Sequence, residues 1–285
     1  MSNVAVVTDS ASDMSPHEAA TLGISVVPLV VNFGSETFKA GVDLSKADFW
    51  ARMTAPDAPF PTTAASAPGD FLAVYQAAFD GGADAIVSIH VADTLSGTIK
   101  SARIAAGMLP DREIHIVDTH GVSMAEGILA EMAVEMARLG VSAAEIARVL
   151  ESRADDVSLY VALDTLEYLK KGGRISGAQA AIGSLLSVKP IITIAEGKVE
   201  TADRVRTKGK ARERLIELVT ARPVERVSVL CHAISPEIEA FRDELVGRLA
   251  GGIDPAKVSL DVVGASVGPH LGPGFVGAVS LHSPR

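Results

Sequence analysis

The chain is short of cysteine, aromatic residues and positive charge, and each shortage argues against a class of protein. Cys231 is its single cysteine, so no disulfide can form within the chain, and its apolar neighbours predict a buried structural thiol. Aromatic residues make up 4% of the 285 residues, too few to indicate the stacking platforms of single-stranded nucleic-acid binders. The formal net charge of -9 argues further against a nucleic-acid partner, because phosphate binding needs a basic surface.

Long apolar runs are also missing. No stretch reaches the roughly 20 apolar residues that cross a bilayer, and the first residues lack the basic and apolar regions of a signal peptide. We therefore expect a soluble, cytoplasmic protein. Hydrophobic residues make up 48% of the chain and charged residues 21%, which is typical of a protein with a sizeable folded core.

The first half of the chain alternates short β-branched runs with helical patterns. We expect strands at residues 4–7, 24–33, 86–91, 114–118 and 159–163. We expect helices that open at Ser15-Pro16 and at Ser142, and others at residues 68–79, 98–107 and 124–139. This alternation predicts right-handed crossovers and a parallel α/β sheet with helices on both faces.

The second half reads differently. Residues 188–194 and 198–205 flank Glu196-Gly197 and predict a hairpin. Helices are expected from 209 to about 219 and from 236 to about 251, and strands at 227–232, 258–263 and 275–281. Antiparallel pairing mixed with helices predicts a smaller C-terminal α+β domain. A polar boundary near Asp155-Asp156 divides the chain into domains 1–156 and 157–285.

The stretch of residues 163–194 is the most informative part of the chain. It contains two pairs with capping-box spacing, Asp164 with Glu167 and Ser176 with Gln179. The first predicts a helix that starts at Asp164 and stops at a left-handed Gly172, and the second predicts a helix to about Leu186. Two caps in one glycine-rich corner suit a binding site, but a simple packing corner fits the pattern equally well.

Three polar loops follow strands of the expected parallel sheet, where functional loops gather. They are Thr8-Asp9-Ser10, the Leu95-Ser96-Gly97-Thr98 loop and Asp118-Thr119-His120. Ser96 precedes a helix, whose free N–H groups and dipole favour a phosphate or a carboxylate. The alternative is that Ser96 only caps this helix.

Two further positions carry side chains suited to binding. Thr63 lies in a proline-rich segment just before the helix expected at Pro68, although an ordinary loop explains it as well. His270 lies between glycines and prolines that restrict the backbone, so its orientation is expected to be fixed. The histidines lack metal-ligand spacing, and neither a phosphate loop nor a nucleophile elbow occurs, so we expect no metal.

Taken together, these segments resemble the DegV family of bacterial fatty-acid-binding proteins. The resemblance spans residues of about 3–283 and rests on an ordered set of motifs: VAVVTDSASDMSP, VPLVVNF, GVDLS, PFPTTAASAPGDF, HVADTLSGTIKSA, LDTLEYLKKGGRISGAQAAIGSLLSVKPIITI and GASVGPHLGPGFVG. One departure stands out. Ala64-Ala65-Ser66 follow Thr63 where the family usually has Ser-Gln-Pro, which thins the expected hydrogen-bond network.

The resemblance implies a carboxylate site between the two domains. Thr63 and Ser96 take the places of the residues that contact the fatty-acid carboxylate, and His270 and Arg206 those of residues in the same network. A buried carboxylate needs several such donors. Neighbouring loop residues are Asp9, Ser10, Gly97, Thr98, Gly172, Gly173 and Arg174. The acyl tunnel is expected along residues 27–33 and 166–186.

The resemblance further implies a carrier without enzyme activity or cofactor. Its ligand would be a long-chain fatty acid such as palmitate. The family presents this ligand to a separate fatty acid kinase, which makes an acyl phosphate for phospholipid synthesis, and a transient contact with a membrane surface suits this role. No nucleic acid is expected.

Two other functions remain open from the residues themselves. Ser96, His270 and either Asp9 or Asp118 are the residue types of a serine hydrolase. A small-phosphate binder or kinase-related subunit is the other alternative, because helix N-termini also hold phosphates. The absence of a phosphate loop argues against phosphoryl transfer.

Overall fold

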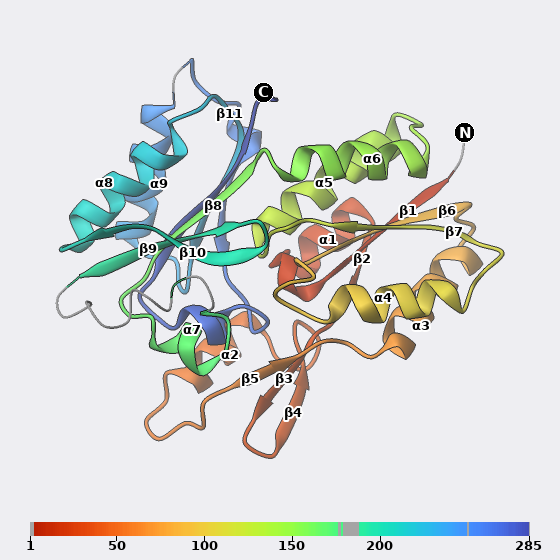
Figure 1. Cartoon of the computed structure of the whole chain (residues 1–285), viewed down its shortest axis with the longest axis horizontal. Helices are drawn as coiled ribbons and strands as arrows, with labels where there is room; N and C mark the ends of the chain where they lie inside the picture. Colours follow the sequence, from red (N-terminus) through yellow and green to blue (C-terminus); the bar gives the residue numbers. More distant parts are fainter. Residues whose placement is uncertain (1–2, 176–177, 179–187, 250, 285) are drawn as a thin grey trace.

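The computed structural model describes residues 3–175, 178, 188–249 and 251–284, which form three sheets with helices between and around them (Figure 1). The N-terminal sheet has the order β2-β1-β6-β7, and all its strands are parallel. The strands are β1 (Val4–Asp9), β2 (Ile24–Val27), β6 (Ala85–His90) and β7 (Glu113–Asp118). β6 is buried at every position, as expected for a parallel strand covered on both faces.

Helices cover both faces of this sheet, which confirms the expected α/β architecture. One face packs against α1 (Pro16–Leu22), α5 (Met124–Arg138) and α6 (Ala143–Ala154). The other face packs against α3 (Pro68–Asp80) and α4 (Thr98–Gly107). α1 opens at Ser15-Pro16 as expected, and there Ser15 and Glu18 form a reciprocal capping box.

The second sheet has six strands in the order β10-β9-β8-β13-β11-β12. Its strands are β8 (Val157–Ala162), β9 (Lys189–Ala195), β10 (Lys198–Val205), β11 (Val224–Cys231), β12 (Val258–Val262) and β13 (Val276–His282). Only the β11–β12 pair is parallel, and β9 and β10 form the expected hairpin. α8 (Lys208–Val219) and α9 (Pro236–Arg248) pack on one face, beside a short 3-10 turn at Pro255–Lys257. The change from one sheet to the other falls between β7 and β8.

A third, three-stranded sheet was not expected from the sequence. It consists of β3 (Val30–Phe33), β4 (Glu36–Lys39) and β5 (Thr62–Ala64). The helix α2 (Lys46–Met53) lies between β4 and β5 in the chain. The expectation of one strand over residues 24–33 was therefore wrong. Pro28 interrupts the strand because it has no N–H, and the N–H of Leu29 donates to Oγ of Ser10 instead of to a strand.

The corner after β8 also differs from its expectation. The helix α7 (Glu167–Lys171) starts after Leu166 and has no side-chain cap. Asp164 does not cap it, because the Asp164 carboxylate pairs with Lys189 at 2.9 Å and with Lys208 at 3.3 Å. Gly173, with φ of 71°, takes the left-handed conformation expected of Gly172. The capping box of Ser176 and Gln179, and the helix expected to Leu186, lie outside the described residues.

The six-stranded sheet shares a hydrophobic core with the three-stranded sheet, with α2 and α5, and with the segments that follow β1 and β6. Trp50 of α2 is buried there, and its indole N–H donates to the carbonyl of Val263 at 2.8 Å. Cys231 is buried as expected, and its burial raises the pKa of the thiol to about 11. None of the helices in the described ranges has the length and apolar character of a membrane span.

Asp13 lies at the junction of these parts and is 1% exposed. Its carboxylate accepts hydrogen bonds from the Ser123 hydroxyl at 2.6 Å and from the Gly264 N–H at 2.7 Å. Burial raises the pKa of Asp13 to about 6, although Lys46 and these donors oppose the shift. The folded chain therefore binds the proton more tightly than the unfolded chain, so stability falls as the pH rises from about 4 to above 6.

We predict that Asp13→Asn raises the free energy of unfolding at pH 8, because it removes a buried charge and keeps a carbonyl acceptor for Gly264. A shift of about two pKa units corresponds to an upper limit of roughly 3 kcal/mol, and the gain should disappear near pH 4. Unfolding midpoints between pH 4 and 8 test this, with the exposed Asp111→Asn as the control. An equal gain at every pH would show that the Asp13 carboxylate is not the cause.

Candidate functional site

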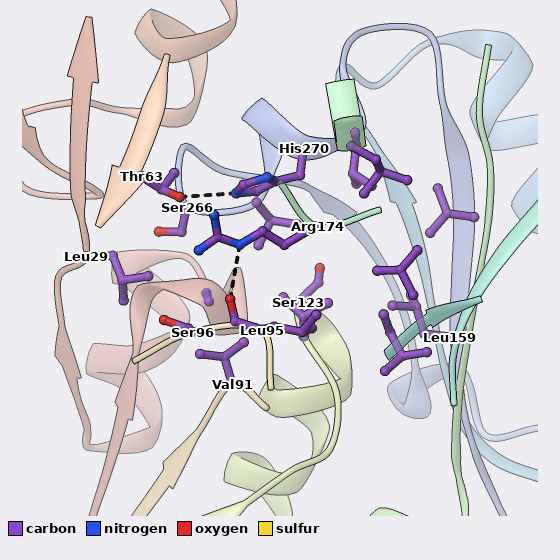
Figure 2. A pocket seen from close by; sticks show the side chains of 18 of the residues that line it. Leu29, Thr63, Val91, Leu95, Ser96, Ser123, Leu159, Arg174, Ser266 and His270 are labelled. Carbon is purple, nitrogen blue, oxygen red and sulfur yellow. Dashed lines mark hydrogen bonds between the residues drawn. The ribbon is translucent and has the colours of Figure 1, made fainter. Parts of the chain in front are cut away.

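A cavity lies between the N-terminal parallel sheet and the six-stranded sheet (Figure 2). It holds about 840 Å³ of empty space, including the part open to solvent. Its walls are mainly aliphatic and come from the strands and loops that face each other: Leu29, Val91, Leu95, Val122, Leu159, Val161, Leu169, Ile192, Ile194, Val199, Leu230, Val267 and Leu271. An apolar ligand would therefore be buried there.

One end of the cavity is polar. Oγ1 of Thr63, on β5, lies 3.1 Å from Nε2 of His270, on the short helix α10 (Gly268–Leu271). The backbone around α10 packs too closely for side chains, since a Cβ on Gly268 would lie 2.4 Å from the ring of Phe49. The glycines of this segment thus let α10 hold the imidazole at the cavity, as the restricted backbone predicted.

Arg174 brings a guanidinium to the same end (Figure 2). Its Nε donates to the carbonyl of Leu95 at 3.2 Å, and its Nη1 donates to the carbonyl of Gly172 at 2.7 Å. Both acceptors are neutral, so the positive charge is not neutralised by these bonds. Arg174 was expected only as a residue of a neighbouring loop, and the structure puts it in the cavity wall.

Ser96 lines the cavity just before α4. The N-cap residue of α4 is Gly97, which offers no side-chain hydrogen bond. The Ser96 hydroxyl instead lies 2.8 Å from Oγ1 of Thr98 and accepts weakly from the Thr98 N–H at 3.3 Å. Ser96 and Gly97 therefore face the cavity from the N-terminal end of a ten-residue helix, whose dipole favours an anion.

Ser266 and Ser123 also line this cavity, and the sequence reasoning missed both. Oγ of Ser266 lies 2.8 Å from Oγ of Ser10, which itself accepts from the Leu29 N–H at 2.8 Å. Ser10 does not line the cavity itself but hydrogen-bonds to two residues of its wall, Ser266 and Leu29. The only available signal for Ser266 was its place four residues before His270.

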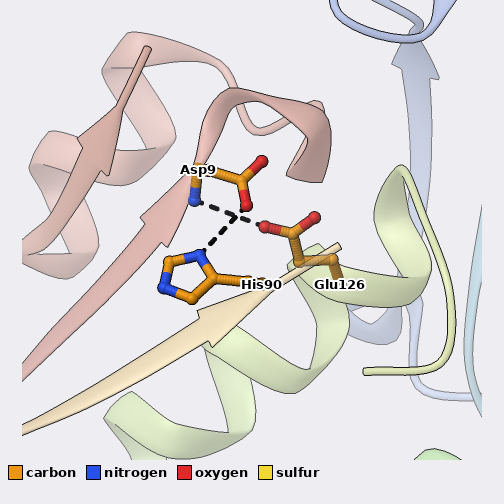
Figure 3. Close-up of side chains that lie close together, drawn as sticks. All are labelled: Asp9, His90 and Glu126. Atoms are coloured by element: carbon orange, nitrogen blue, oxygen red, sulfur yellow. Dashed lines mark hydrogen bonds and ion pairs between the residues drawn. The ribbon is translucent and has the colours of Figure 1, made fainter. Parts of the chain in front are cut away.

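Asp9 belongs to a different cluster, in which it contacts His90 and Glu126 (Figure 3). Asp9 Oδ2 lies 3.0 Å from Nδ1 of His90, and Oε1 of Glu126 accepts from the Asp9 N–H at 3.3 Å. All three side chains are fully buried, and none lines the cavity. Burial and then the Asp9 charge hold the pKa of Glu126 well above its usual range, and Oε1 of Glu126 also accepts from the Thr8 hydroxyl at 2.7 Å.

The same three residues are the one metal-ligand cluster among the described residues, with ligand atoms within 4.8 Å of one another. Both ring nitrogens of His90 are already used, because Nε2 lies 2.6 Å from Oγ of Ser88 and Nδ1 contacts Asp9. The arrangement is therefore that of a hydrogen-bonded structural network beneath the cavity and not of an open metal centre.

Neither Arg206 nor a serine-hydrolase triad is found in this cavity among the described residues. Arg206 is exposed beyond the end of β10 and does not line the cavity. A serine-hydrolase triad is not formed among the described residues, because His270 bonds to Thr63 and Asp9 pairs with His90. Asp118 accepts hydrogen bonds from the N–H groups of His120 and Asp93 instead.

Comparison with known proteins agrees with this architecture. Residues 3–283 match the family model described as an uncharacterised protein of the DegV family. The chain belongs to the DegV family. It is 37% identical over 281 residues to a DegV domain-containing protein of Streptomyces coelicolor, with 97% of this chain and 98% of that protein covered. The resemblance seen in the sequence motifs is thus confirmed.

Solved structures of DegV family members have the same fold. A family protein from Thermus thermophilus, described as fatty acid binding, superposes with a TM-score of 0.90 at 34% identity over 99% of this chain and 100% of that one. DegV of Bacillus subtilis, described as a fatty acid binding protein, superposes with a TM-score of 0.86 at 30% identity over the same shares of the two chains.

The protonation state of His270 follows from its surroundings. Burial, and then the charge of Arg174, lower the pKa of His270 to about 4. We predict that His270 stays neutral in the lipid-free protein down to about pH 4, when it is followed by NMR titration of its ring carbons. A midpoint near 6.5, the value of an exposed histidine, would contradict this placement.

The position of His270 depends on Gly172, because a Cβ on Gly172 would lie 2.1 Å from Nδ1 of His270. We predict that Gly172→Ala displaces the imidazole from Thr63 and raises the pKa of His270 toward 6.5 in the same titration. Gly247→Ala is the control, since a Cβ there meets open space on the exposed face of α9. An unchanged His270 titration in Gly172→Ala would refute the steric argument.

Proposed function

We propose that this chain binds one long-chain fatty acid, with the acyl chain in the aliphatic cavity and the carboxylate at its polar end. The observation that carries the proposal is the combination of an aliphatic cavity with a single convergent group of donors, formed by Thr63, Ser96, His270 and Arg174. The descriptions of the Thermus thermophilus and Bacillus subtilis structures support it.

The donors match what a carboxylate requires. Removing an ionised carboxylate from water is costly unless hydrogen bonds and charge replace its hydration. The hydroxyls of Thr63 and Ser96 and an N–H of neutral His270 can donate, and Arg174 adds a positive charge that no described carboxylate pairs with. Charge-assisted bonds of this kind are stronger than neutral ones.

The rest of the cavity suits an unbranched hydrocarbon chain. Each methylene group moved from water into an apolar site contributes roughly 0.8 kcal/mol. Leu159 and Val161 of β8 and Ile192 and Ile194 of β9 supply one wall, and the opposite wall comes from residues of the N-terminal half. In this proposal the ligand lies between a domain of residues 1–156 and a domain of residues 157–285.

The proposed role is that of a carrier. We infer that the chain presents the fatty acid to a separate kinase, which phosphorylates the carboxylate, and that the acyl phosphate then enters phospholipid synthesis. The resemblance of the motifs to the DegV family supports this, as does the lack of a phosphate loop in the sequence. Transfer of an acyl chain to lipid would also require a transient contact with a membrane surface.

The test is to extract lipid from the purified, denatured protein and to measure binding of palmitate to the lipid-free protein. We predict near-stoichiometric fatty acid in the extract. Thr63→Ala and Ser96→Ala should each weaken palmitate binding roughly 10- to 100-fold, since a hydrogen bond to a charged group contributes about 1.5–3 kcal/mol.

The chain offers a matched control for each variant. Thr62→Ala changes the exposed neighbour of Thr63 on β5, and Ser101→Ala changes a serine one turn into α4 that does not line the cavity. Both should bind palmitate like the unmodified protein. No lipid in the extract together with no uptake of palmitate would refute the proposal, and equal affinities of all four variants would refute the carboxylate assignment.

A further inference from the structure

A second cavity lies on the opposite side of the six-stranded sheet, where α8 and α9 begin. It holds about 750 Å³ of empty space, including its opening to solvent, and shares no residue with the first cavity. Its floor is formed by residues at the carboxyl ends of β8 and β11, and by Phe275 and Val276 at the start of β13.

Positive charge predominates in this second cavity. Lys189, Lys208 and Arg212 line it, against the carboxylates of Asp164 and Glu237. Asp164 contacts both lysines, and Glu237 contacts Arg212 at 2.8 Å. The Glu237 side chain is 76% exposed, so solvent screens its pairing with Arg212 and weakens it.

His232 adds a directed donor to the cavity. Its Nδ1 accepts a hydrogen bond from the Gly274 N–H at 3.3 Å, which puts the ring proton on Nε2. Edge-to-face packing on Trp50, with ring centroids 5.6 Å apart, holds the ring in place. No described residue accepts from Nε2, so this N–H is free to bind a ligand.

The lysines of this cavity lower the pKa values of two neighbouring groups, Asp164 and His232. Partial burial acts to raise the pKa of Asp164, yet that pKa lies below its usual value because Lys189 and Lys208 donate hydrogen bonds to the carboxylate. Partial burial, and then the charge of Lys208, lower the pKa of His232. The imidazole is therefore neutral near pH 7 and acts as an N–H donor.

We propose that this second cavity binds a small phosphate-bearing anion through Lys189, Lys208, Arg212 and the Nε2–H of His232. Three cations suit a phosphate dianion better than a carboxylate, and the planar guanidinium of Arg212 can engage two oxygens of a tetrahedral group. The N-terminal ends of α8 and α9, of 12 and 13 residues, add their dipoles at the same rim.

Asp164 limits the affinity of this site. Its carboxylate occupies the two lysines when no ligand is bound, so an incoming phosphate competes with it. The structure therefore makes a prediction of opposite signs: loss of a cation should weaken phosphate binding, and loss of the Asp164 charge should strengthen it.

The test is calorimetric titration of the full chain with inorganic phosphate and with glycerol phosphate, at constant ionic strength set with sodium chloride. The double variant Lys208→Gln/Arg212→Gln should bind phosphate at least tenfold more weakly, and Asp164→Asn severalfold more tightly. Lys210→Gln is the matched control, because Lys210 is exposed on the same helix and does not line the cavity, and it should change the affinity less than twofold.

Four outcomes would overturn the proposal. They are no heat of binding with either phosphate compound, an equal affinity for acetate, an equal loss in Lys210→Gln, or a loss in Ser96→Ala but not in the double variant. The last would put the phosphate in the first cavity. Tighter binding of glycerol phosphate than of inorganic phosphate would identify a phosphorylated small molecule as the ligand, and the reverse order would identify free phosphate. The fatty-acid proposal does not depend on any of these results.

Discussion

The hydrogen bond between Thr63 and His270 joins segments that are 207 residues apart in the sequence. It connects the three-stranded sheet to α10 and closes the polar end of the cavity. Its geometry depends on close backbone packing, because Gly172 leaves no room for a side chain beside the imidazole. The same glycine accepts a hydrogen bond from Arg174. The Thr63–His270 contact and the carbonyls of Leu95 and Gly172 together place a hydroxyl, an imidazole and a guanidinium at the polar end of the cavity.

Desolvation also shifts the pKa values of ionisable groups that are buried in the molecule. The buried groups Asp13, Glu126 and His270 each have hydrogen-bond partners and a pKa that is shifted toward the neutral form. Burial lowers the pKa of His270 to about 4, and burial beside the Asp9 charge raises the pKa of Glu126. The Asp13 carboxylate accepts two hydrogen bonds, and burial still raises its pKa to about 6. These buried groups tie the parallel sheet to the segments around it, and they leave the charge of Arg174 as the main attraction for an anion in the first cavity.

The two cavities lie on opposite faces of the six-stranded sheet and differ in polarity. Alternate residues of β8 face in opposite directions, so Leu159 and Val161 line the first cavity and Ala162 lines the second. The first cavity is aliphatic with a small polar end, which suits an amphipathic ligand. The second is polar and rich in cations, which suits a compact anion. β8 thus contributes residues to two cavities that differ in charge.

Much of the secondary structure could be predicted because it depends on local chemistry. The bounds of α4 and the β9–β10 hairpin follow from helix propensity, hydrophobic periodicity and a Glu-Gly turn, and the cap at Ser15 follows from two residues three apart. The three-stranded sheet could not be predicted in this way, because its strands have three or four residues each and are stabilised by one another and not by their own sequence.

The same division applies to the candidate site. The sequence by itself determined that Thr63, Ser96 and His270 carry suitable donors, because motif and residue type are properties of the chain. Only the tertiary structure decided that Arg174 and not Arg206 reaches the cavity, and that Asp9 belongs to a buried network with His90 and Glu126. The physical reason is that charge placement depends on which segments pack together across long sequence separations, and local pattern does not contain that information.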